Sequence, residues 1–294
     1  MRFLKTSEAA AMLNVSPNTL RTWERRFGFP KPQRSPGRHR LYTHGEIAGL
    51  RDALQEGLSI SSAVSRAREG LTADTHSLVG ALASFEPERA DAAMEAVIAL
   101  RSVDRAIEEV LLPSLEKTGR RHGLDSAAWA FAAGWGAGWL RRARRLASPP
   151  ALPVSVIVGD ASRDELDASA PAIRALEVLC LRGGIGVLGL SARGAGGMSE
   201  ALADRRPNLV VIAGDHLDDD TVARWAYAVR LAAGPLPVAT FRRGSVRAQV
   251  RSTGATALAV SPTEARAEIM DLLGVALPGR EPAIDLEETR VAAG

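Results

Sequence analysis

Apolar residues recur at helical spacing through most of the first half of the chain and in short unbroken runs through the second half. In the first half they lie three or four positions apart, as they do along one face of an amphipathic helix. From Val154 onward, short apolar runs alternate with amphipathic stretches. This change predicts a mainly helical first half and a parallel α/β sheet in the second half.

The segment 16–27 predicts a helix with one apolar and one basic face. Ser16 is a good N-cap, and Pro17 occupies the first helical turn, where a missing N–H is tolerated. Apolar residues then recur at helical spacing, at Leu20, Trp23 and Phe27. The remaining surface carries mainly basic side chains, at Arg21, Thr22, Arg25 and Arg26. Gly28 and the prolines behind it end the helix.

A basic β-hairpin is predicted over residues 33–42. Its cations surround the turn pair Pro36-Gly37, at Arg34, Arg38, His39 and Arg40. A basic helix followed by a basic hairpin offers one element for a DNA groove and another for the adjacent phosphates. The residues alone leave a second interpretation open, in which both segments are simply solvated surface.

Upstream, residues 6–13 predict a short capped helix, and Asn14-Val15 the turn between two helices. Helix, turn, basic helix and basic wing form a winged helix-turn-helix. The stretch TLRTWERRFGFPKPQR, with the later GRHRLY, resembles the MerR family, and its Trp form resembles the light- and cobalamin-responsive subgroup often called CarA/CarH/LitR. The resemblance implies DNA contacts from eight residues, Thr19, Arg21, Thr22, Arg25, Arg38, His39, Arg40 and Tyr42.

The resemblance also implies partners. It predicts a double-stranded, pseudo-palindromic operator that is bound by a homodimer or a higher oligomer, with RNA polymerase or an antirepressor protein as further candidate partners. The charge distribution agrees with a DNA partner. Residues 1–70 hold 12 Lys and Arg against 6 Asp and Glu, whereas the remainder holds 25 against 28. The basic excess therefore lies on the segment that would neutralise phosphates.

Cysteine content and hydropathy predict a cytoplasmic protein with no membrane partner. The single cysteine, Cys180, excludes an intramolecular disulfide and lies in an apolar helical run, as a buried small hydrophobe would. No apolar run reaches 18 residues, and the N-terminus leads directly into the first helix rather than into a signal peptide.

Domain boundaries follow from breaks in the pattern. Helices that begin at Thr43 and behind Ser59 brace the wing, Gly70 ends the second, and residues 72–75 form a linker, so the DNA-binding domain covers 1–71. Four apolar stripes in 76–147 predict a four-helix bundle. Two adjacent prolines within 147–153 mark a second linker.

A flavodoxin-like, doubly wound parallel sheet is predicted over 153–275. Its expected strands are 154–158, 185–190, 209–213, 238–241 and 255–260, and its expected helices are 168–182, 199–204, 221–233 and 264–273. The acidic tail 276–294 is expected to be disordered. Winged helix, bundle and flavodoxin-like sheet together have the architecture of the cobalamin-binding subgroup.

The resemblance implies cobalamin, but the residues that would hold it differ. Asp160 fits the family's Asp-x-His-x-x-Gly, yet Ser162 replaces the ligand histidine and Glu165 replaces the glycine. A hydroxyl is a poor cobalt ligand beside an imidazole. The family's Ser-x-Leu is missing at 213–215, and its Gly-Gly is replaced at 239–241. We therefore expect no base-off cobalamin and predict no cofactor.

In the fourth bundle helix, the family's Glu-His pair is absent and tryptophans alternate with glycines instead. The tryptophans are Trp129, Trp135 and Trp139, and the glycines are Gly134, Gly136 and Gly138. One interpretation is core packing, in which small residues let the sheet domain sit directly on the bundle. The other is an aromatic pocket for a different apolar ligand, with Asp160 and Ser162 at its edge.

Enzyme chemistry is not indicated. The glycine-rich segments 183–186 and 194–197 lack the Gly-x-Gly-x-x-Gly order, and the acidic run 215–220 lacks a nucleophile or a base. The histidines show no metal-binding spacing. The chain is predicted to be a MerR-like transcriptional regulator of repressor type whose C-terminal half self-associates and senses an effector or partner. The alternative is a cobalamin-responsive or other ligand- or protein-interaction sensor in which the sheet domain is the primary binding module.

Overall fold

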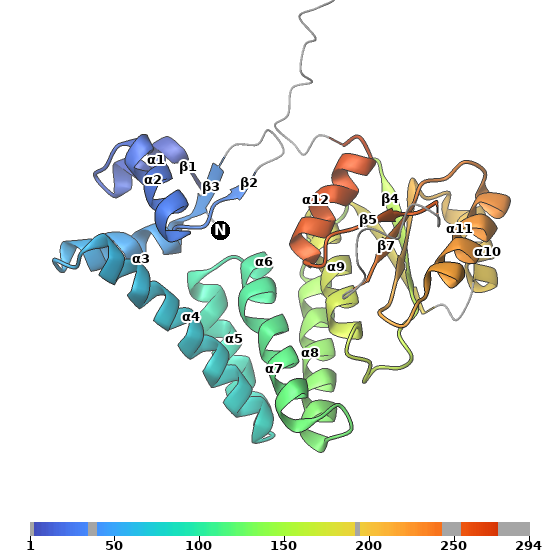
Figure 1. Ribbon diagram of the computed structural model, residues 1–294, viewed down its shortest axis with the longest axis horizontal. Coiled ribbons are helices and arrows are strands. Elements are labelled where there is room, and N and C mark those ends of the chain that lie inside the picture. Colours follow the sequence, from blue (N-terminus) through green and yellow to red (C-terminus); the bar gives the residue numbers. More distant parts are fainter. Residues whose placement is uncertain (1–2, 35–39, 192–194, 243–253, 276–294) are drawn as a thin grey trace, which may run out of the picture.

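The computed structural model describes residues 3–34, 40–191, 195–242 and 254–275. Figure 1 shows three units, namely an N-terminal winged-helix domain, a helical bundle, and a C-terminal sheet domain. The winged-helix and sheet domains both lie toward one end of the bundle, on opposite sides of it. The predicted fold class, a mainly helical first half followed by a parallel α/β sheet, is confirmed.

The winged-helix domain contains a helix-turn-helix and a small antiparallel sheet. Its helices are α1 (Thr6–Met12), α2 (Pro17–Phe27) and α3 (His44–Gln55). Its strands are β1 (Phe3–Lys5), β2 (Gln33–Arg34) and β3 (Arg40–Thr43), in the order β1-β3-β2. The hairpin β2–β3 is as predicted, but β1 was missed, because three residues are too few to show an alternation and their partner β3 is distant in sequence.

Helix α4 (Ile60–Ala83) contradicts the predicted linker at residues 72–75. Gly70 has open space around it and lies inside the helix, so it does not end the helix. Asp74 is held within α4 by an ion pair of 2.5 Å to Arg101. A long helix therefore does continue beyond Gly70, and it joins the winged-helix domain to the bundle without interruption.

The remaining bundle helices are α5 (Pro87–Leu100), α6 (Val103–Ala106), the π-helix η1 (Ile107–Leu111), α7 (Leu112–His122) and α8 (Ala127–Arg145). Since α6, η1 and α7 follow one another without a break, they form one long helical run, and the bundle has the predicted four helices. The π-helix was not predicted, because a change from a four-residue to a five-residue hydrogen-bond step leaves no clear trace in an apolar stripe.

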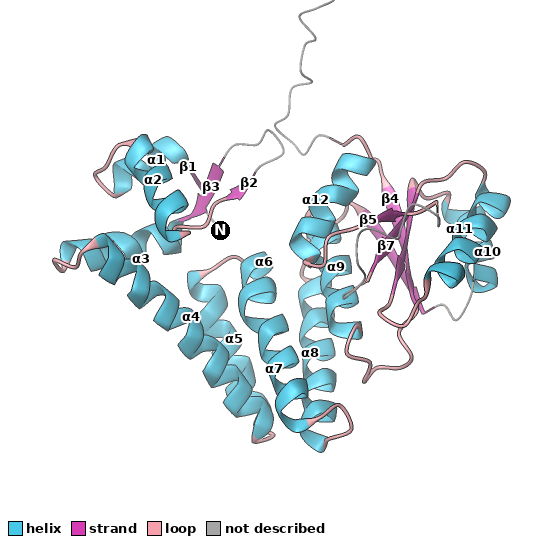
Figure 2. Ribbon diagram, viewed as in Figure 1, coloured by secondary structure: helices cyan, strands magenta, loops and turns pink. Residues whose placement is uncertain are grey.

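The sheet domain has five parallel strands in the order β5-β4-β6-β7-β8. Figure 2 shows this sheet in magenta with helices on both sides of it. The strands are β4 (Ser155–Asp160), β5 (Gly186–Ser191), β6 (Leu209–Ala213), β7 (Val238–Phe241) and β8 (Thr256–Ala257). This order is the flavodoxin-like 2-1-3-4-5, as predicted. The last strand is shorter than the predicted 255–260, and the run of coil between α8 and β4 agrees with the predicted linker.

Within its described residues, the sheet domain has four α-helices: α9 (Ala170–Arg182), α10 (Ser199–Arg205), α11 (Asp219–Ala233) and α12 (Pro262–Leu272). A short 3-10 turn, η2 (Ala195–Met198), precedes α10. Helix α9 packs against both α8 and α12, so the bundle covers one face of the sheet through α9. Among the helices of the described residues, none combines the length and hydropathy needed to cross a bilayer.

Candidate functional site: the basic surface, the interdomain cleft and the domain junction

The first candidate site is the exposed face of α2. Ser16 caps this helix by accepting a hydrogen bond of 3.0 Å from the Thr19 amide, and Gly28 ends it in the left-handed conformation with φ 64°. Leu20 faces the core of the domain and is fully buried. Arg21 and Arg25 are exposed on the opposite face.

Arg40 reaches this face from the wing. Its Nε donates a hydrogen bond of 2.7 Å to Glu24 Oε2, and the hydroxyl of Tyr42 lies 3.4 Å from the same oxygen. Burial and the Glu24 carboxylate raise the pKa of Tyr42 to about 12, so the phenol stays protonated and donates. Glu24 on the helix thereby fixes the position of Arg40 on the strand.

Tyr42 itself needs a correction. The resemblance placed it among the residues that contact DNA, but its side chain is 0 % exposed and belongs to the core of the winged-helix domain. Its side chain lies on the core-facing side of β3, where it can hold Glu24 and Arg40 in place without reaching a ligand. A tyrosine in a basic strand does not reveal from the sequence which face of the strand it occupies.

Six residues line a shallow hollow between α2 and β3: Asn18, Arg21, Thr22, Glu24, Arg25 and Arg40. Thr19 lies beside it, with its hydroxyl 2.8 Å from that of Ser16. Arg38 and His39 fall outside the described residues. The sequence identified most of this surface, but it missed Glu24, whose carboxylate looked like one solvated charge among many.

The second candidate site is a cleft of about 450 Å³ between the bundle and the sheet domain. The bundle wall is formed by α7 and the start of α8, at Leu112, Leu115, Glu116, Gly119, Arg120, Leu124 and Trp129. The sheet domain contributes Ala168, Pro171, Asp215 and Val260. These last residues follow the carboxyl ends of β4, β6 and β8, which is where open α/β sheets bind ligands.

Only Trp129 of the three tryptophans lines this cleft. Its Nε1 donates a hydrogen bond of 2.7 Å to the Leu166 carbonyl, which joins the bundle to the sheet domain. Gly119 lets the ring approach α7, because a Cβ there would lie 3.1 Å from the indole. A cleft with an aromatic wall and few charged residues can hold a mainly apolar ligand.

Trp135 and Trp139 lie on other faces of α8. Both pack against the bundle core, and Trp135 Nε1 donates a hydrogen bond of 3.1 Å to Asp91 on α5. Of the three interleaved glycines, only Gly136 is closely packed, against Leu115. The structure therefore separates Trp129 from Trp135 and Trp139, which the sequence suggested as one pocket. Trp135 lies six residues after Trp129 and so occupies another face of the helix, whereas the four-residue spacing keeps Trp135 and Trp139 on one face.

Asp160 and Ser162 also lie away from Trp129. Asp160 is buried at the end of β4, where its Oδ1 accepts a hydrogen bond of 2.8 Å from the Ser162 amide. It lines a separate pocket of about 190 Å³ together with Arg141, Arg144, Arg174 and Glu177. Arg144 pairs with the buried Glu177 at 2.5 Å, and burial raises the pKa of that carboxyl.

The residues at this sheet edge do not fit base-off cobalamin. A serine hydroxyl stands at 162, where the resemblance requires an imidazole, and Glu165 is an exposed side chain 3.6 Å from Arg174 where it requires a glycine. At 239–241, where the resemblance requires a Gly-Gly, the side chains of Ala239, Thr240 and Phe241 are all buried.

One histidine does lie at this edge. His216, in the loop after β6, has its Nε2 3.1 Å from Asp167 Oδ2. Asp167 is buried; burial opposes its ionisation, but hydrogen bonds from the Arg163 and Ser169 amides outweigh this and lower the pKa of the carboxyl. The sequence did not pair these residues, which lie far apart along the chain. Within the described ranges, no three His, Cys, Asp or Glu side chains gather closely enough to hold a metal ion.

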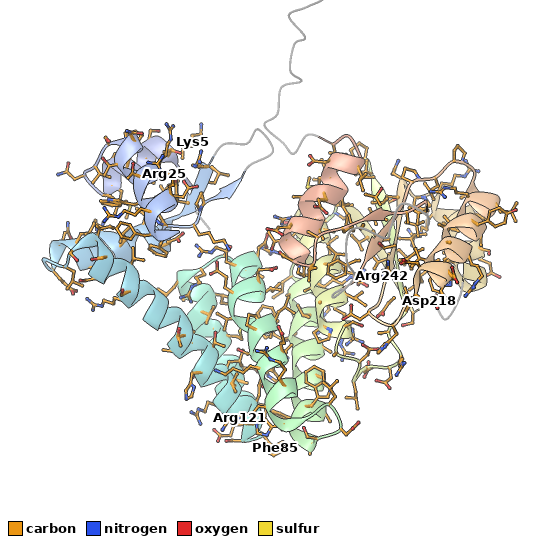
Figure 3. All side chains as sticks on the ribbon, viewed as in Figure 1. Lys5, Arg25, Phe85, Arg121, Asp218 and Arg242 are labelled. Atoms are coloured by element: carbon orange, nitrogen blue, oxygen red, sulfur yellow. The ribbon has the colours of Figure 1, made fainter. Side chains whose placement is uncertain are left out.

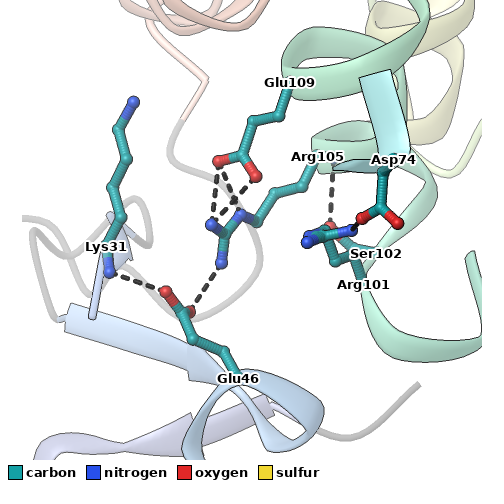
Figure 4. A network of polar contacts seen from close by, with 7 residues as sticks. All are labelled: Lys31, Glu46, Asp74, Arg101, Ser102, Arg105 and Glu109. Atoms are coloured by element: carbon teal, nitrogen blue, oxygen red, sulfur yellow. Dashed lines mark hydrogen bonds and ion pairs between the residues drawn. The ribbon is translucent and has the colours of Figure 1, made fainter. Parts of the chain in front are cut away.

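A third feature is an ion cluster between the winged-helix domain and the bundle, shown in Figure 4. Arg105 donates to Glu46 at 2.6 Å and to Glu109 at 2.9 and 3.0 Å. The Lys31 amide donates to the other oxygen of Glu46 at 2.8 Å. No sequence signal could have paired Glu46 with Arg105, because the two lie 59 residues apart in different units.

The comparisons with known proteins agree with the architecture. Residues 5–42 match the family described as MerR family regulatory protein. The chain is similar to the HTH-type transcriptional repressor CarA of Myxococcus xanthus, with 32 % identity over 133 residues that cover 40 % of this chain and 45 % of CarA. It is also 28 % identical over 143 residues to the HTH-type transcriptional repressor CarH of the same organism, covering 41 % of this chain and 48 % of CarH.

The chain thus spans about half the length of these curated relatives. Among solved structures, a cobalamin-binding protein from Desulfitobacterium hafniense is similar with 12 % identity and a TM-score of 0.35, covering 66 % of this chain and 96 % of that one.

Proposed function

We propose that this chain, whose N-terminal domain is a MerR-family helix-turn-helix homologous to those of CarA and CarH, is a sequence-specific DNA-binding transcriptional regulator. The observation that carries the proposal is the surface formed by Arg21, Arg25 and Arg40. Two arginines on a recognition helix and one on the adjoining wing are spaced to meet a groove and the flanking phosphates. Glu24 orients the third of them before DNA arrives.

The test begins with selection of duplexes from a random library by the full chain. Arg25→Ala is expected to weaken binding to the selected duplex and to lower the salt slope by about one unit, which is the signature of a lost phosphate contact. Arg121→Ala is the matched control, since Arg121 is an exposed arginine at the far end of the bundle (Figure 3). If no duplex is enriched, or both variants bind alike, the proposal is wrong.

Arg40 distinguishes phosphate contact from base readout. We expect Arg40→Ala to weaken binding to selected and unrelated duplexes alike and to lower the salt slope by about one unit. An unchanged slope with an altered sequence preference would instead assign Arg40 to a base edge.

Self-association is the second part of the proposal. Two-fold dimers of winged helices read pseudo-palindromic sites, whose half-site spacing mirrors the symmetry of the protein. Analytical ultracentrifugation of the full chain with the selected duplex is expected to show two or more chains for each duplex. One chain on each duplex would contradict this part of the proposal while leaving DNA binding intact.

The third part concerns the effector. We propose that the sheet domain and bundle act as a repressor-type sensor without base-off cobalamin ligation. The proposal is supported by Ser162, which stands where the resemblance requires an imidazole, and by the buried side chains at 239–241, where it requires a Gly-Gly. Titration with adenosylcobalamin in the dark is expected to leave the corrin absorbance spectrum unchanged. Micromolar binding with a shifted spectrum would overturn this part.

A second candidate function rests on the apolar cleft beside Trp129. In that alternative, the sheet domain with its cleft is the primary binding module for a ligand or partner protein, and DNA binding is secondary. Salt-dependent, tight binding of a selected duplex favours the regulator. A partner that binds the full chain tightly when DNA binding is weak and unselective favours the alternative.

A further inference from the structure

The helical run over residues 103–122 belongs to the bundle and contacts both the winged-helix domain and the sheet domain. It consists of α6, η1 and α7 in direct succession, and in Figure 1 it lies in the bundle with its α6 end toward the winged-helix and sheet domains. Two neighbouring stripes of charged side chains occupy this end. They are one residue out of step, so they face different directions around the helix.

The first stripe faces the winged-helix domain. Arg105 and Glu109 lie one turn apart on the run and form an ion pair with each other. Arg105 also pairs with Glu46 of α3, at 2.6 Å. The cluster is largely excluded from water, since the side chains of Glu46, Arg105 and Glu109 are 4 %, 11 % and 14 % exposed. One guanidinium bridges two carboxylates here, so the cluster holds α3 in one orientation against the run.

The second stripe faces the sheet domain. Asp104 accepts hydrogen bonds from Arg182 of α9 at 2.6 Å and from Arg266 of α12 at 2.7 Å. One turn later, Glu108 accepts from the Thr263 hydroxyl at 3.1 Å. Neighbouring residues of one helix therefore pair with opposite domains, and neither domain can shift along this end without moving the other or breaking a pair.

The other end of the same run lines the apolar cleft. Leu112, Leu115, Glu116, Gly119 and Arg120 all belong to α7 and form part of the cleft wall. The π-helix η1 lies between the two ends, at residues 107–111. Segments of π-helix are rare and concentrate at functional sites, where they change the register of a helix locally.

We propose that the run 103–122 is the regulatory connection between the cleft and the DNA-binding surface. This rests on the proposed function, in that the cleft is taken as the effector site and α2 as the reading element. A ligand or partner that displaces α7 moves Arg105 and Glu109 with it, because a closely packed helix moves as a body. The orientation of α3 changes in response, and that of α2 follows, because α1 packs against both helices.

The test measures hydrogen exchange in the full chain without DNA or ligand. Asp104→Asn alters only the stripe that faces the sheet domain. We expect amide exchange in α3 to rise about fivefold, the lower end of common coupling strengths, together with exchange in α12. Asp91→Asn is the matched control, because it removes another bundle carboxylate, paired with Arg142 at 2.8 Å, and is expected to leave α3 unchanged.

Coupling is reciprocal, so the opposite substitution gives a second reading. Arg105→Gln is expected to raise exchange in α12 and in α9 as well as in α3. If that variant fails to fold, Arg105→Lys keeps the charge but cannot bridge both carboxylates in the same planar geometry, and it is expected to show a smaller rise in the same helices.

If Asp104→Asn raises amide exchange only in the sheet domain and Arg105→Gln raises it only in the winged-helix domain, the proposal is overturned. Because the measurement uses no DNA, it separates the two hypotheses. If exchange rises in both domains but no duplex is selected, only the regulator function fails. A selected duplex with uncoupled exchange rejects the connection alone.

Discussion

The bundle joins the sheet domain and the winged-helix domain by interfaces of different chemistry. Against the sheet domain it shares one apolar core, in which Ala175, Val178 and Leu179 of α9 pack among the bundle side chains. The winged-helix domain has its own core, and the cluster centred on the bundle begins only at Leu78. Its connection to the bundle consists of the continuous helix α4 and the ion cluster around Arg105.

The difference has a physical consequence. Burial of apolar surface is non-directional and cooperative, so the bundle and sheet domain are expected to unfold as one unit. An ion cluster depends on the geometry of a few atoms, and a small change in position weakens it. The orientation of the winged-helix domain therefore depends on a few specific polar contacts, and a change at those contacts can alter it.

The largest expected effect tests the shared core. Leu179→Ala removes a fully buried side chain between bundle and sheet, and we expect it to lower the free energy of unfolding by about 2–5 kcal/mol. Urea unfolding followed by the fluorescence of the tryptophans in α8 and α11 measures it. Leu231→Ala is the control, since Leu231 is 77 % exposed, and is expected to change stability by at most about 0.5 kcal/mol. A second transition in Leu179→Ala that separates bundle from sheet would contradict the single unit.

The next effect concerns the polar part of the same interface. A Cβ at Gly189 would lie 2.1 Å from Glu177 Oε1, so Gly189→Ala must displace the buried carboxylate from Arg144. We expect a loss of about 1–3 kcal/mol, the usual range for overpacking. Thermal unfolding measures the change. Stability equal to that of the parent would mean that the Arg144–Glu177 pair contributes little to the joint.

A smaller effect of opposite sign is expected at Gly134. Nothing lies within 4 Å of a Cβ at this position, which is in the interior of α8. Gly134→Ala is therefore expected to stabilise the protein by about 0.5–1 kcal/mol through helix propensity alone. Gly136→Ala is the matched comparison, because its Cβ would meet Leu115 at 2.8 Å. Equal effects at the two positions would show that packing does not distinguish them.

The smallest effect tests the charged joint through pH. Burial raises the pKa of Glu46 above its usual range, even with Arg105 beside it, and Glu109 adds to the rise. The folded state therefore binds this proton more tightly than the unfolded state does. The associated stability is complete below the ordinary value of 4.5 and is lost as pH rises through the raised pKa.

Glu46→Gln removes this dependence. We expect the variant to lose less stability than the parent as pH rises from about 4.5 toward neutrality, measured as urea midpoints at matched pH values. Glu56→Gln is the control, since it removes an exposed carboxylate of the same domain that pairs with Arg66. A steeper loss in Glu46→Gln would mean that attraction to Arg105 outweighs burial.

Local features of the chain were largely predictable. Capping by Ser16, the stop at Gly28 and the strands of the sheet follow from short-range chemistry and periodicity, and the structure has them where they were expected. The predicted linker at residues 72–75 was wrong, because glycine and small polar residues near position 70 weaken a helix without ending it. Packing against α5 and α7 outweighs that propensity cost.

The candidate sites divide along the same line. Arg21, Arg25 and Arg40 could be identified because a basic helix and wing carry their chemistry in a short stretch of sequence. Burial of Tyr42 could not, because the side of a strand that faces the core depends on its neighbours. The separation of Trp129 from Trp135 and Trp139 follows from their spacing along one helix, which the interpretation as one pocket left out of account.

By itself, the sequence determined the order of the three units and the helix-turn-helix with its basic surface. These depend on residue identity and on spacing within one element. Only the tertiary structure decided that Glu46 meets Arg105, that Asp104 meets Arg266, and that α7 forms a wall of the cleft. Such contacts join residues far apart in the chain, and their geometry arises only when whole elements pack.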